Sequence, residues 1–503
     1  MIEELKSTPY MGDYIDGRFL VPASPDGSIE IQSPADLSDK VITVPFKLDH
    51  VEVATKAAAK AFYPWARLSL NERKNYLVKL KDVFEAHSEQ MAVMISRETG
   101  KPIWESRTEA KALAAKIDVT LNHSLKLVQT ERIENALPGV DGVTRHQPRG
   151  VMAVVGPFNF PAHLPNGHII PALITGNTIV FKPSDKTPAV GQLMAQLFEK
   201  AEFPRGVFNL VQGRGESGRR LVIDDNVAGI LFTGSYEVGL KIKEDTLNHF
   251  WKITALEMGG KNATVVWHDA EMEKALYETL IGCFLTAGQR CSCTSRVILH
   301  KSIADKFIDR FYAAAKKIKI GHWREEVLFG PLISKDSVEK YLRFQEIAKR
   351  EGAEPLMRGK VLELEKQGYY VTPSINIVKE MKSKSVYQRS EIFGPNVAVY
   401  TVQDFDEALE VVNNTSYGLV MSVFTKDKTL YEESLLKTRI GMVNWNRTTN
   451  GGSSKLPFGG RGKSGNDRPS GNSAVQYCTV PVASLEDTKG FDRKSMMPGI
   501  VLD

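Results

Sequence analysis

The hydrophobic and polar positions of this chain follow different periods in successive segments. Residues 1–50 alternate over short stretches around turn signals such as the Asp-Gly pair of YIDGRF, which is typical of strands and turns. From about Val51 to Asn122 the apolar positions recur with a helical period, in segments rich in Ala, Leu, Lys and Glu that Gly100 and Pro102 punctuate. We interpret this helical part as a scaffold with little functional content.

From Gly150 the pattern changes to strands alternating with helices. Apolar, β-branched runs such as GVMAVVGP, NTIVFKP and GILFTG lie between helical segments, as a buried parallel sheet requires. After Asn262 the alternation continues, with strands expected at ATVVW, SRVILH, VAVYTV and VMSVFT. We therefore predict an α/β fold with two α/β units and a nucleotide site at the carboxyl ends of the first set of strands.

Two segments stand outside this alternation. Residues 132–150 lack a helical period and contain a turn, which favours a protruding β-hairpin. The segment NSAVQYCTVPVASLED is strand-like, and its Cys478 is expected to be structural. Residues after Asp487 show no recognisable element.

Composition narrows the class of protein. A chain of 503 residues suggests two or three domains, and 42% hydrophobic with 25% charged residues is ordinary for a globular protein. The net charge is only +5 and no run of five like charges occurs, so we expect no nucleic-acid partner. Four unevenly spaced cysteines favour reduced thiols, and the start MIEELKSTPYMGDYIDG has no apolar signal region. The chain has no run of about 18 apolar residues that would predict a membrane span. The expected reduced thiols favour the cytoplasm as the location.

The candidate chemistry is concentrated in residues 255–296. Cys291 follows the helix-stop residues of TAGQR, which places its thiol on a loop at the end of an element, where reactive groups usually lie. Glu257 precedes Gly259 and Gly260, where an extended or looped backbone lets a carboxylate face a cleft. Cys291 is thus a candidate nucleophile and Glu257 a candidate base.

The residues alone leave other interpretations open. Most cysteines are buried small hydrophobic residues, as expected for Cys283 inside the apolar helical segment. Cys291 and Cys293 would need about two further ligands for a closed zinc site, and nothing nearby in the sequence supplies them. His163 and His168 suggest a metal site, but we expect Pro165 to break the helical spacing between them. We therefore predict no metal.

Three glycine-rich segments compete for the nucleotide. GRGESG (213–218) is a weak match, because no long helix is expected after it and the next acidic residues follow too soon for a ribose contact. GSYEVG (234–239) follows a strand and opens a helical stretch, so its amides and helix start can face a pyrophosphate. PFGGRGKSG has Pro457 where a Walker A loop needs its first glycine. We select GSYEVG.

The segments LEMGGK and GQRC, which contain Glu257 and Cys291, resemble the two signatures of the aldehyde dehydrogenase superfamily, Glu-x-Gly-Gly-Lys and Gly-Gln-x-Cys. The resemblance implies a cysteine nucleophile at Cys291 and a general base at Glu257. It also implies that Asn159 of GPFNFP forms the oxyanion hole with the backbone N–H of Cys291. Taken alone, Asn159 would be interpreted as a helix cap.

The same resemblance implies NAD as the cofactor, held by residues of three segments. Asp185 of FKPSD would accept a hydrogen bond from the 2′-hydroxyl and repel a 2′-phosphate, which favours NAD over NADP. Taken alone, Lys182 would be interpreted as a solvated surface lysine. The implied cofactor-binding residues are Lys182, Asp185, Gly234, Ser235, Gly239, Glu391 and Phe393.

The resemblance further implies a Rossmann-type nucleotide-binding domain (1–128 and 150–257), an α/β catalytic domain (258–470) and a small β oligomerisation arm (129–149 and 471–489), followed by a tail (490–503). A homo-oligomer, dimer or tetramer, is expected. Members that pass the acyl group to coenzyme A generally lack the glutamate at Glu257, so the expected product is a free carboxylic acid.

The segments HLPNGHI and SGNDRPS are most similar to the N-succinylglutamate 5-semialdehyde dehydrogenases of arginine catabolism, although Lys463 and GNSAV depart from that pattern. Arg468 or Lys455 is a candidate for holding a substrate carboxylate, and solvation at the surface is the alternative. Two other functions stay open, namely an enzyme for another semialdehyde or aliphatic aldehyde, and a catalytically idle binding or structural protein.

Overall fold

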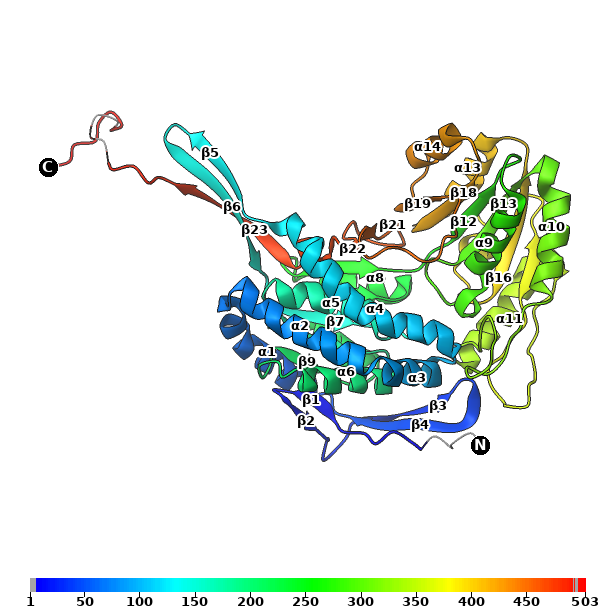
Figure 1. Ribbon diagram of the computed structural model, residues 1–503, viewed down its shortest axis with the longest axis horizontal. Coiled ribbons are helices and arrows are strands. Elements are labelled where there is room, and N and C mark those ends of the chain that lie inside the picture. The colour runs from blue at the N-terminus through cyan, green and yellow to red at the C-terminus, as the bar shows by residue number, and fades with distance from the viewer. Residues whose placement is uncertain (1–5, 492, 494–495) are drawn as a thin grey trace.

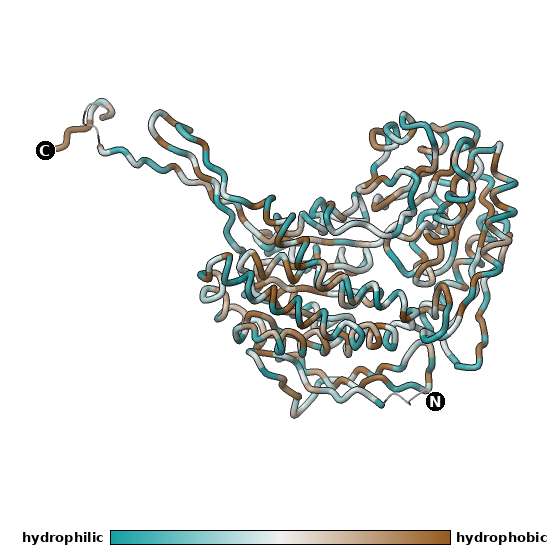
Figure 2. Tube along the Cα trace, viewed as in Figure 1, coloured by the Kyte–Doolittle hydropathy of each residue, from teal (hydrophilic) through white to brown (hydrophobic). Residues whose placement is uncertain are grey.

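The computed structural model describes residues 6–491, 493 and 496–503 and contains two seven-stranded sheets, each flanked by helices (Figure 1). The first sheet has the order β11-β10-β7-β8-β9-β1-β2, and the second β14-β15-β16-β13-β12-β18-β19. Apolar residues concentrate in these two layered bodies (Figure 2). This arrangement confirms the predicted α/β fold with two α/β units.

The first sheet is parallel except at one edge. Its strands are β7 (Val151–Val155), β8 (Thr178–Lys182), β9 (Phe208–Leu210), β10 (Val227–Thr233) and β11 (Ile253–Glu257), with β1 (Asp13–Ile15) and β2 (Arg18–Leu20) added antiparallel. The helices around it include α1 (His50–Arg67), α2 (Leu70–Ala86), α3 (Ser88–Thr99), α4 (Ile103–Asn122), α5 (His163–Ile174), α6 (Pro188–Lys200), α7 (Gly215–Ile223) and α8 (Tyr236–Asp245). The hairpin of β3 (Gly27–Ser33) and β4 (Asp36–Phe46) lies beside it.

Strand β7 shows why the sheet is covered on both faces. Val151 and Ala153 belong to a core formed with α1, α7 and α8. Met152 and Val154 belong to a second core formed with α2, α4, α5 and α6. Successive side chains of a strand point to opposite faces, so an uninterrupted apolar run requires helices on both sides.

The second sheet repeats this plan. Its parallel strands are β15 (Ser374–Ile377), β16 (Asn396–Val402), β13 (Thr294–His300), β12 (Asn262–Val266), β18 (Val420–Phe424) and β19 (Met442–Trp445), with β14 (Glu354–Met357) antiparallel at the edge. Helices α9 (Met272–Phe284), α10 (Lys301–Ala315), α11 (Lys335–Arg350), α13 (Phe405–Asn413) and α14 (Lys428–Lys437) accompany it. Chain segments 257–262 and 457–471 pass between the two bodies.

A three-stranded antiparallel sheet projects from the first body (Figure 1). It consists of β5 (Glu131–Leu137), β6 (Val140–Pro148) and β23 (Thr479–Glu486), so the predicted hairpin is present. The C-terminal segment is not strand from its start, because the short helix α15 (Ala474–Tyr477) precedes β23. Every residue of β5 is exposed.

Helix α5 corrects the interpretation of Pro165. The helix begins at His163, so Pro165 lies in its first turn, where a backbone N–H has no partner within the helix and proline is tolerated. His163 and His168 therefore belong to one helix. Over the described parts of the chain, no group of three potential metal ligands is present. None of the described helices combines the length and apolar character needed to cross a membrane.

Candidate active site

A cleft of about 1000 Å³ lies between the two bodies and is lined by residues of both. It contains nine of the ten predicted site residues, namely Asn159, Lys182, Asp185, Gly234, Ser235, Glu257, Cys291, Glu391 and Phe393. Gly239 lies behind the wall: a Cβ atom there would come within 2.3 Å of the Met258 sulfur. Its small size lets α8 pack closely on the end of β11.

Cys291 lies on the loop that follows α9 and the short 3₁₀ helix η2 (Leu285–Gly288). Thr286, Ala287 and Gly288 have φ values of 56°, 52° and 71°, which is a left-handed run. Such a conformation costs about 1–3 kcal/mol at each non-glycine residue, so contacts must hold it. The Cys291 carbonyl accepts a hydrogen bond from Nδ2 of Asn262 at 2.6 Å.

The environment of Cys291 favours the neutral thiol. Burial raises the pKa of the Cys291 thiol well above its ordinary value, and the nearby carboxylates of Glu257 and Glu391 raise it further. The guanidinium of Arg290 counteracts part of this effect. The thiol therefore needs a base or an additional positive charge before it becomes a nucleophilic thiolate.

Glu257 ends β11, and its paired residue on the neighbouring strand is Thr233. Its side chain is only 4% exposed, and Oε1 has no hydrogen-bond partner among the described residues. Burial raises the pKa of the Glu257 carboxyl well above its ordinary value. A second cavity of about 160 Å³ meets the carboxyl from the side of Gly459 and Arg468. Glu257 thus has an unsatisfied oxygen and open space on two sides.

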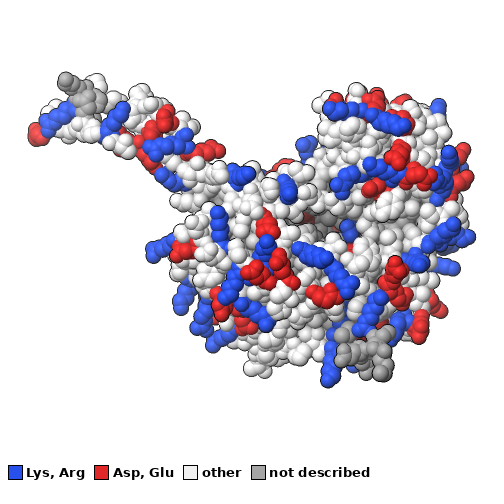
Figure 3. Space-filling model, in the orientation of Figure 1, with Lys and Arg blue, Asp and Glu red and all other residues white. Residues whose placement is uncertain are grey.

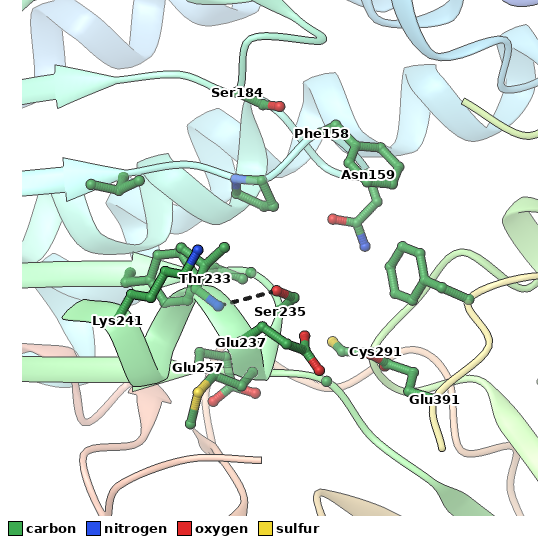
Figure 4. A pocket seen from close by; sticks show the side chains of 18 of the residues that line it. Phe158, Asn159, Ser184, Thr233, Ser235, Glu237, Lys241, Glu257, Cys291 and Glu391 are labelled. Carbon is green, nitrogen blue, oxygen red and sulfur yellow. Dashed lines mark hydrogen bonds between the residues drawn. The ribbon is translucent and has the colours of Figure 1, made fainter. Parts of the chain in front are cut away.

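Asn159 lies in the loop between β7 and α5 and is 6% exposed. It does not cap the helix, because the N-cap residue of α5 is Ala162. Its Nδ2 donates to the backbone carbonyl of Gln289 at 2.9 Å, two residues before the nucleophile. The amide of Asn159 and the thiol of Cys291 face the same space (Figure 4). The amide is thus a hydrogen-bond donor beside the candidate nucleophile.

Lys182 is buried at the end of β8, and the interpretation as a surface lysine is wrong. Its Nζ donates to the carbonyl of Pro183 at 3.0 Å. Burial lowers the pKa of Lys182 to about 8, and the carboxylate of Asp185 opposes that shift. A buried ammonium with one carbonyl partner retains two unused donors for a ligand.

Helix α8 presents its N-terminus to the cleft. Ser235 caps it, accepting a hydrogen bond from the Val238 N–H at 3.3 Å, and Gly234 and Ser235 line the cleft. Unpaired N–H groups at a helix start favour an anion such as a phosphate. The predicted helical stretch is thus present as α8, which ends at Asp245.

The glycine-rich segment GRGESG also reaches the cleft. Helix α7 begins at Gly215 inside GRGESG, and Gly215, Glu216, Gly218 and Arg219 line the same space. The segment is a weak match in the sequence because no long helix is expected after it, and α7 indeed has only nine residues. One sign of a nucleotide-binding segment was present nonetheless, because the strand β9 precedes GRGESG by only a few residues.

Glu391 and Phe393 lie on the opposite wall, on a loop without regular structure. Oε1 of Glu391 accepts the Gly260 N–H at 2.8 Å, which ties this loop to the segment after Glu257. Burial raises the pKa of Glu391 to about 7, while the Gly260 N–H and Lys340 oppose that shift. Phe393 has a φ of 60° and packs edge-on against Phe158 at 5.8 Å between ring centroids.

The site fits a dinucleotide coenzyme by its size and donors. A long cleft with a helix start, a buried ammonium and a buried carboxyl along its length matches the successive phosphates and hydroxyls of such a molecule. Acidic and basic side chains are interspersed on the face shown in Figure 3, in keeping with the small net charge.

Comparison with known proteins agrees with this geometry. Residues 21–482 match the aldehyde dehydrogenase family. The chain is 39% identical over 462 residues to an N-succinylglutamate 5-semialdehyde dehydrogenase of Yersinia pestis, covering 90% of each chain. It is 38% identical over 453 residues to the protein of that name from Escherichia coli, covering 90% of this chain and 91% of that protein.

Solved structures give the same result. The NAD-dependent aldehyde dehydrogenase of Sinorhizobium meliloti superposes with a TM-score of 0.91 and 29% identity, covering 96% of each chain. Betaine aldehyde dehydrogenase of Staphylococcus aureus, solved in complex with NAD⁺, superposes with a TM-score of 0.89 and 28% identity, covering 97% of this chain and 99% of that one.

Proposed function

Because the chain belongs to the aldehyde dehydrogenase family, we propose that it oxidises N-succinyl-L-glutamate 5-semialdehyde to N-succinyl-L-glutamate in arginine catabolism, with NAD as the coenzyme. The observation that carries the chemistry is one cleft that brings Cys291, Glu257 and Asn159 together. The substrate follows from relatives of that name at 38–39% identity over nine-tenths of the chain.

In the proposed reaction the Cys291 thiolate attacks the aldehyde carbon and forms a thiohemiacetal. The Asn159 amide and the Cys291 N–H donate to the oxygen on which negative charge develops, a contribution worth roughly 100- to 1,000-fold in rate. A nicotinamide coenzyme, when bound, supplies the hydride acceptor that turns the thiohemiacetal into a thioester. The carbonyl carbon then remains attached to the sulfur of Cys291.

Glu257 performs the second half of the proposed reaction. As a carboxylate it removes a proton from a water molecule that attacks the thioester, which releases the carboxylic acid and the thiol. Its unsatisfied Oε1 and the open space on both sides of it support this role, because a water molecule needs both an acceptor and room.

The proposed coenzyme contacts come from three segments. Lys182 and Asp185 hold the adenosine ribose, and Gly234, Ser235 and the start of α8 hold the pyrophosphate, with Gly239 allowing α8 to pack closely. Glu391 holds the nicotinamide ribose, and Phe393 lies beside the ring. The carboxylate of Asp185 favours NAD, because it would repel the 2′-phosphate of NADP.

We further propose that residues 1–128 and 150–257 form the coenzyme domain, 258–470 the catalytic domain and 129–149 with 471–489 an arm used in a homo-oligomer. Support for the arm comes from apolar side chains left in water: Ile133, Leu137 and Leu485 are 64%, 50% and 62% exposed. Sedimentation or light scattering of the purified protein tests this assembly, and a monomer would contradict it.

A substrate panel tests the function. Purified protein is given NAD with N-succinylglutamate semialdehyde, glutamate semialdehyde, succinate semialdehyde or simple aliphatic aldehydes, and NADH is recorded. The expected result is the highest kcat/KM for the first, lost in Cys291→Ser. Better rates on another aldehyde would reject the substrate and keep the chemistry. No NADH with any aldehyde would leave a catalytically idle member of the fold.

A further inference from the structure

Three charged side chains at the start of α4 lie beside the candidate site and are four residues apart. Lys101 precedes the helix, and Glu105 and Glu109 lie in its first two turns. At this spacing Glu105 and Glu109 project from one face of the helix. The exposed fractions of the three side chains are 3%, 2% and 2%. Buried charges cost free energy unless they are paired. The hydrogen-bond and ion-pair partners of these three side chains therefore show which segments they hold in place.

Glu109 and Lys101 hold the loop that carries Asn159. Oε1 of Glu109 accepts the backbone N–H groups of Ala162 and His163 at 3.0 and 3.1 Å. Lys101 pairs with Glu109 and donates from Nζ to the backbone carbonyl of Asn159 at 2.9 Å. The middle of the loop between β7 and α5 and its junction with α5 are therefore held by Lys101 and Glu109.

Glu105 holds the loop that carries Cys291. Its Oε1 accepts a short hydrogen bond from Oγ1 of Thr286 and a second one from Arg290 at 2.8 Å. Thr286 is one of the residues with a left-handed backbone, and Arg290 immediately precedes the nucleophile. Glu105 thus holds the strained start of the loop and its reactive end.

The two held loops also meet each other. Lys101 Nζ and the Arg290 guanidinium both lie over the ring of Phe160, at 4.1 and 4.9 Å from its centroid. Nδ2 of Asn159 donates to Gln289. The two held loops are therefore adjacent at the candidate site.

We propose that Lys101, Glu105 and Glu109 are positioning residues that set the separation between the Asn159 amide and the Cys291 thiol. This inference rests on the proposed function, since it requires Asn159 and Cys291 to act on the same carbonyl group. One rigid helix holds both loops, so its side chains determine how the donor and the nucleophile face each other. The three residues do this without touching the substrate.

The test compares variants of the purified full-length protein with a matched control. Lys101→Met removes the hold on the Asn159 loop, Glu105→Gln weakens the hold on the Cys291 loop, and Lys101→Arg restores the charge. The control is Glu98→Gln. Glu98 is a 1% exposed carboxylate of α3 that accepts the Ala189 and Val190 N–H groups at 2.8 Å each, away from both loops.

Three quantities are measured for each variant: the single-turnover rate of NADH formation, the dissociation constant of NAD, and the rate at which iodoacetamide alkylates Cys291. For Lys101→Met we expect NADH formation about 10- to 100-fold slower, because a displacement of about 1 Å has that effect on an aligned reaction. Coenzyme affinity and alkylation should match the wild type, since neither uses the Asn159 amide. Lys101→Arg should recover most of the rate.

For Glu105→Gln the alkylation rate should change together with NADH formation, because the thiol itself moves. The inference is overturned if Lys101→Met and Glu98→Gln slow NADH formation equally while they lower the thermal midpoint equally. If Lys101→Met does not fold, Glu105→Gln decides by the same comparison. Wild-type protein that oxidises no aldehyde would reject the proposed function itself. An active wild type with variants that match the control would reject only the positioning role.

Discussion

Gly260 offers a quantitative test of how closely the segment after Glu257 approaches the nucleophile. A Cβ atom at this position would lie 2.4 Å from the backbone carbonyl oxygen of Cys291, and 2.6 and 2.8 Å from the side-chain amide atoms of Asn262. The amide cannot swing away freely, because it donates to the carbonyls of Cys291 and Cys293 and accepts from the Val420 N–H.

Gly260→Ala must therefore displace the backbone of Cys291. An ordinary contact begins near 3.4 Å, so the carbonyl has to move by about 1 Å. A shift of that size at a reacting group lowers the rate by about 100-fold, and an overfilled core costs about 1–3 kcal/mol in folding free energy. We expect slow NADH formation in single-turnover experiments and a lower thermal midpoint.

Gly167→Ala is the matched control, because a Cβ atom there meets nothing within 4 Å in the middle of α5. It should raise the free energy of unfolding by about 0.4–1 kcal/mol, because alanine lowers the conformational entropy of the unfolded chain. The rate of NADH formation should be unchanged. A Gly260→Ala protein with the wild-type rate would refute the close approach as a constraint on the nucleophile. Equal loss of activity in Gly260→Ala and Gly167→Ala would refute it as well.

Four further outcomes are expected. Asn159→Ala should slow NADH formation by roughly 100- to 1,000-fold with unchanged NAD binding, whereas an unchanged rate would remove Asn159 from the oxyanion hole. Glu257→Gln should keep the first turnover of NADH but release product about 100- to 10,000-fold more slowly, and loss of the first turnover would contradict its role as base. Since burial raises the pKa of Glu257, the wild-type release rate should rise with pH above the range in which a carboxyl group ordinarily titrates, and the wild type should lose thermal stability relative to Glu257→Gln over the same rise. Asp185→Asn should lower the preference for NAD over NADP by at least about 10-fold, judged from the two kcat/KM values, because a repelling charge is removed.

Without the family resemblance, which supplied Asn159 and the coenzyme residues, the sequence predicted the parts of the site that local rules determine. The end of an apolar run before two glycines places Glu257 at the end of β11, and a helix-stop segment places Cys291 on a loop. The hairpin of β5 and β6 follows from a turn between alternating segments. Each of these signals lies within about ten residues of the feature it predicts.

The parts that were missed depend on contacts between distant segments. In the sequence, Lys101, Glu105 and Glu109 have the spacing of a solvated helix face, which is the usual meaning of charged residues four positions apart. Their burial is caused by loops 53 to 185 residues away in the chain. The burial of Lys182 was missed for the same reason, since a lone lysine carries no sign of what covers it, although the family resemblance had assigned Lys182 to the coenzyme.

The contacts of α4 also limit how this enzyme can be recombined with its relatives. Replacing one partner of a buried ion pair leaves an uncompensated charge, which costs about 3–5 kcal/mol. A chimera that takes residues 100–110 from another protein therefore has to bring that protein's loops around Asn159 and Arg290 with them. These three segments must be exchanged together although they are far apart in the chain. Chimeras whose crossover points keep the three segments from one parent should be more stable than chimeras that separate them.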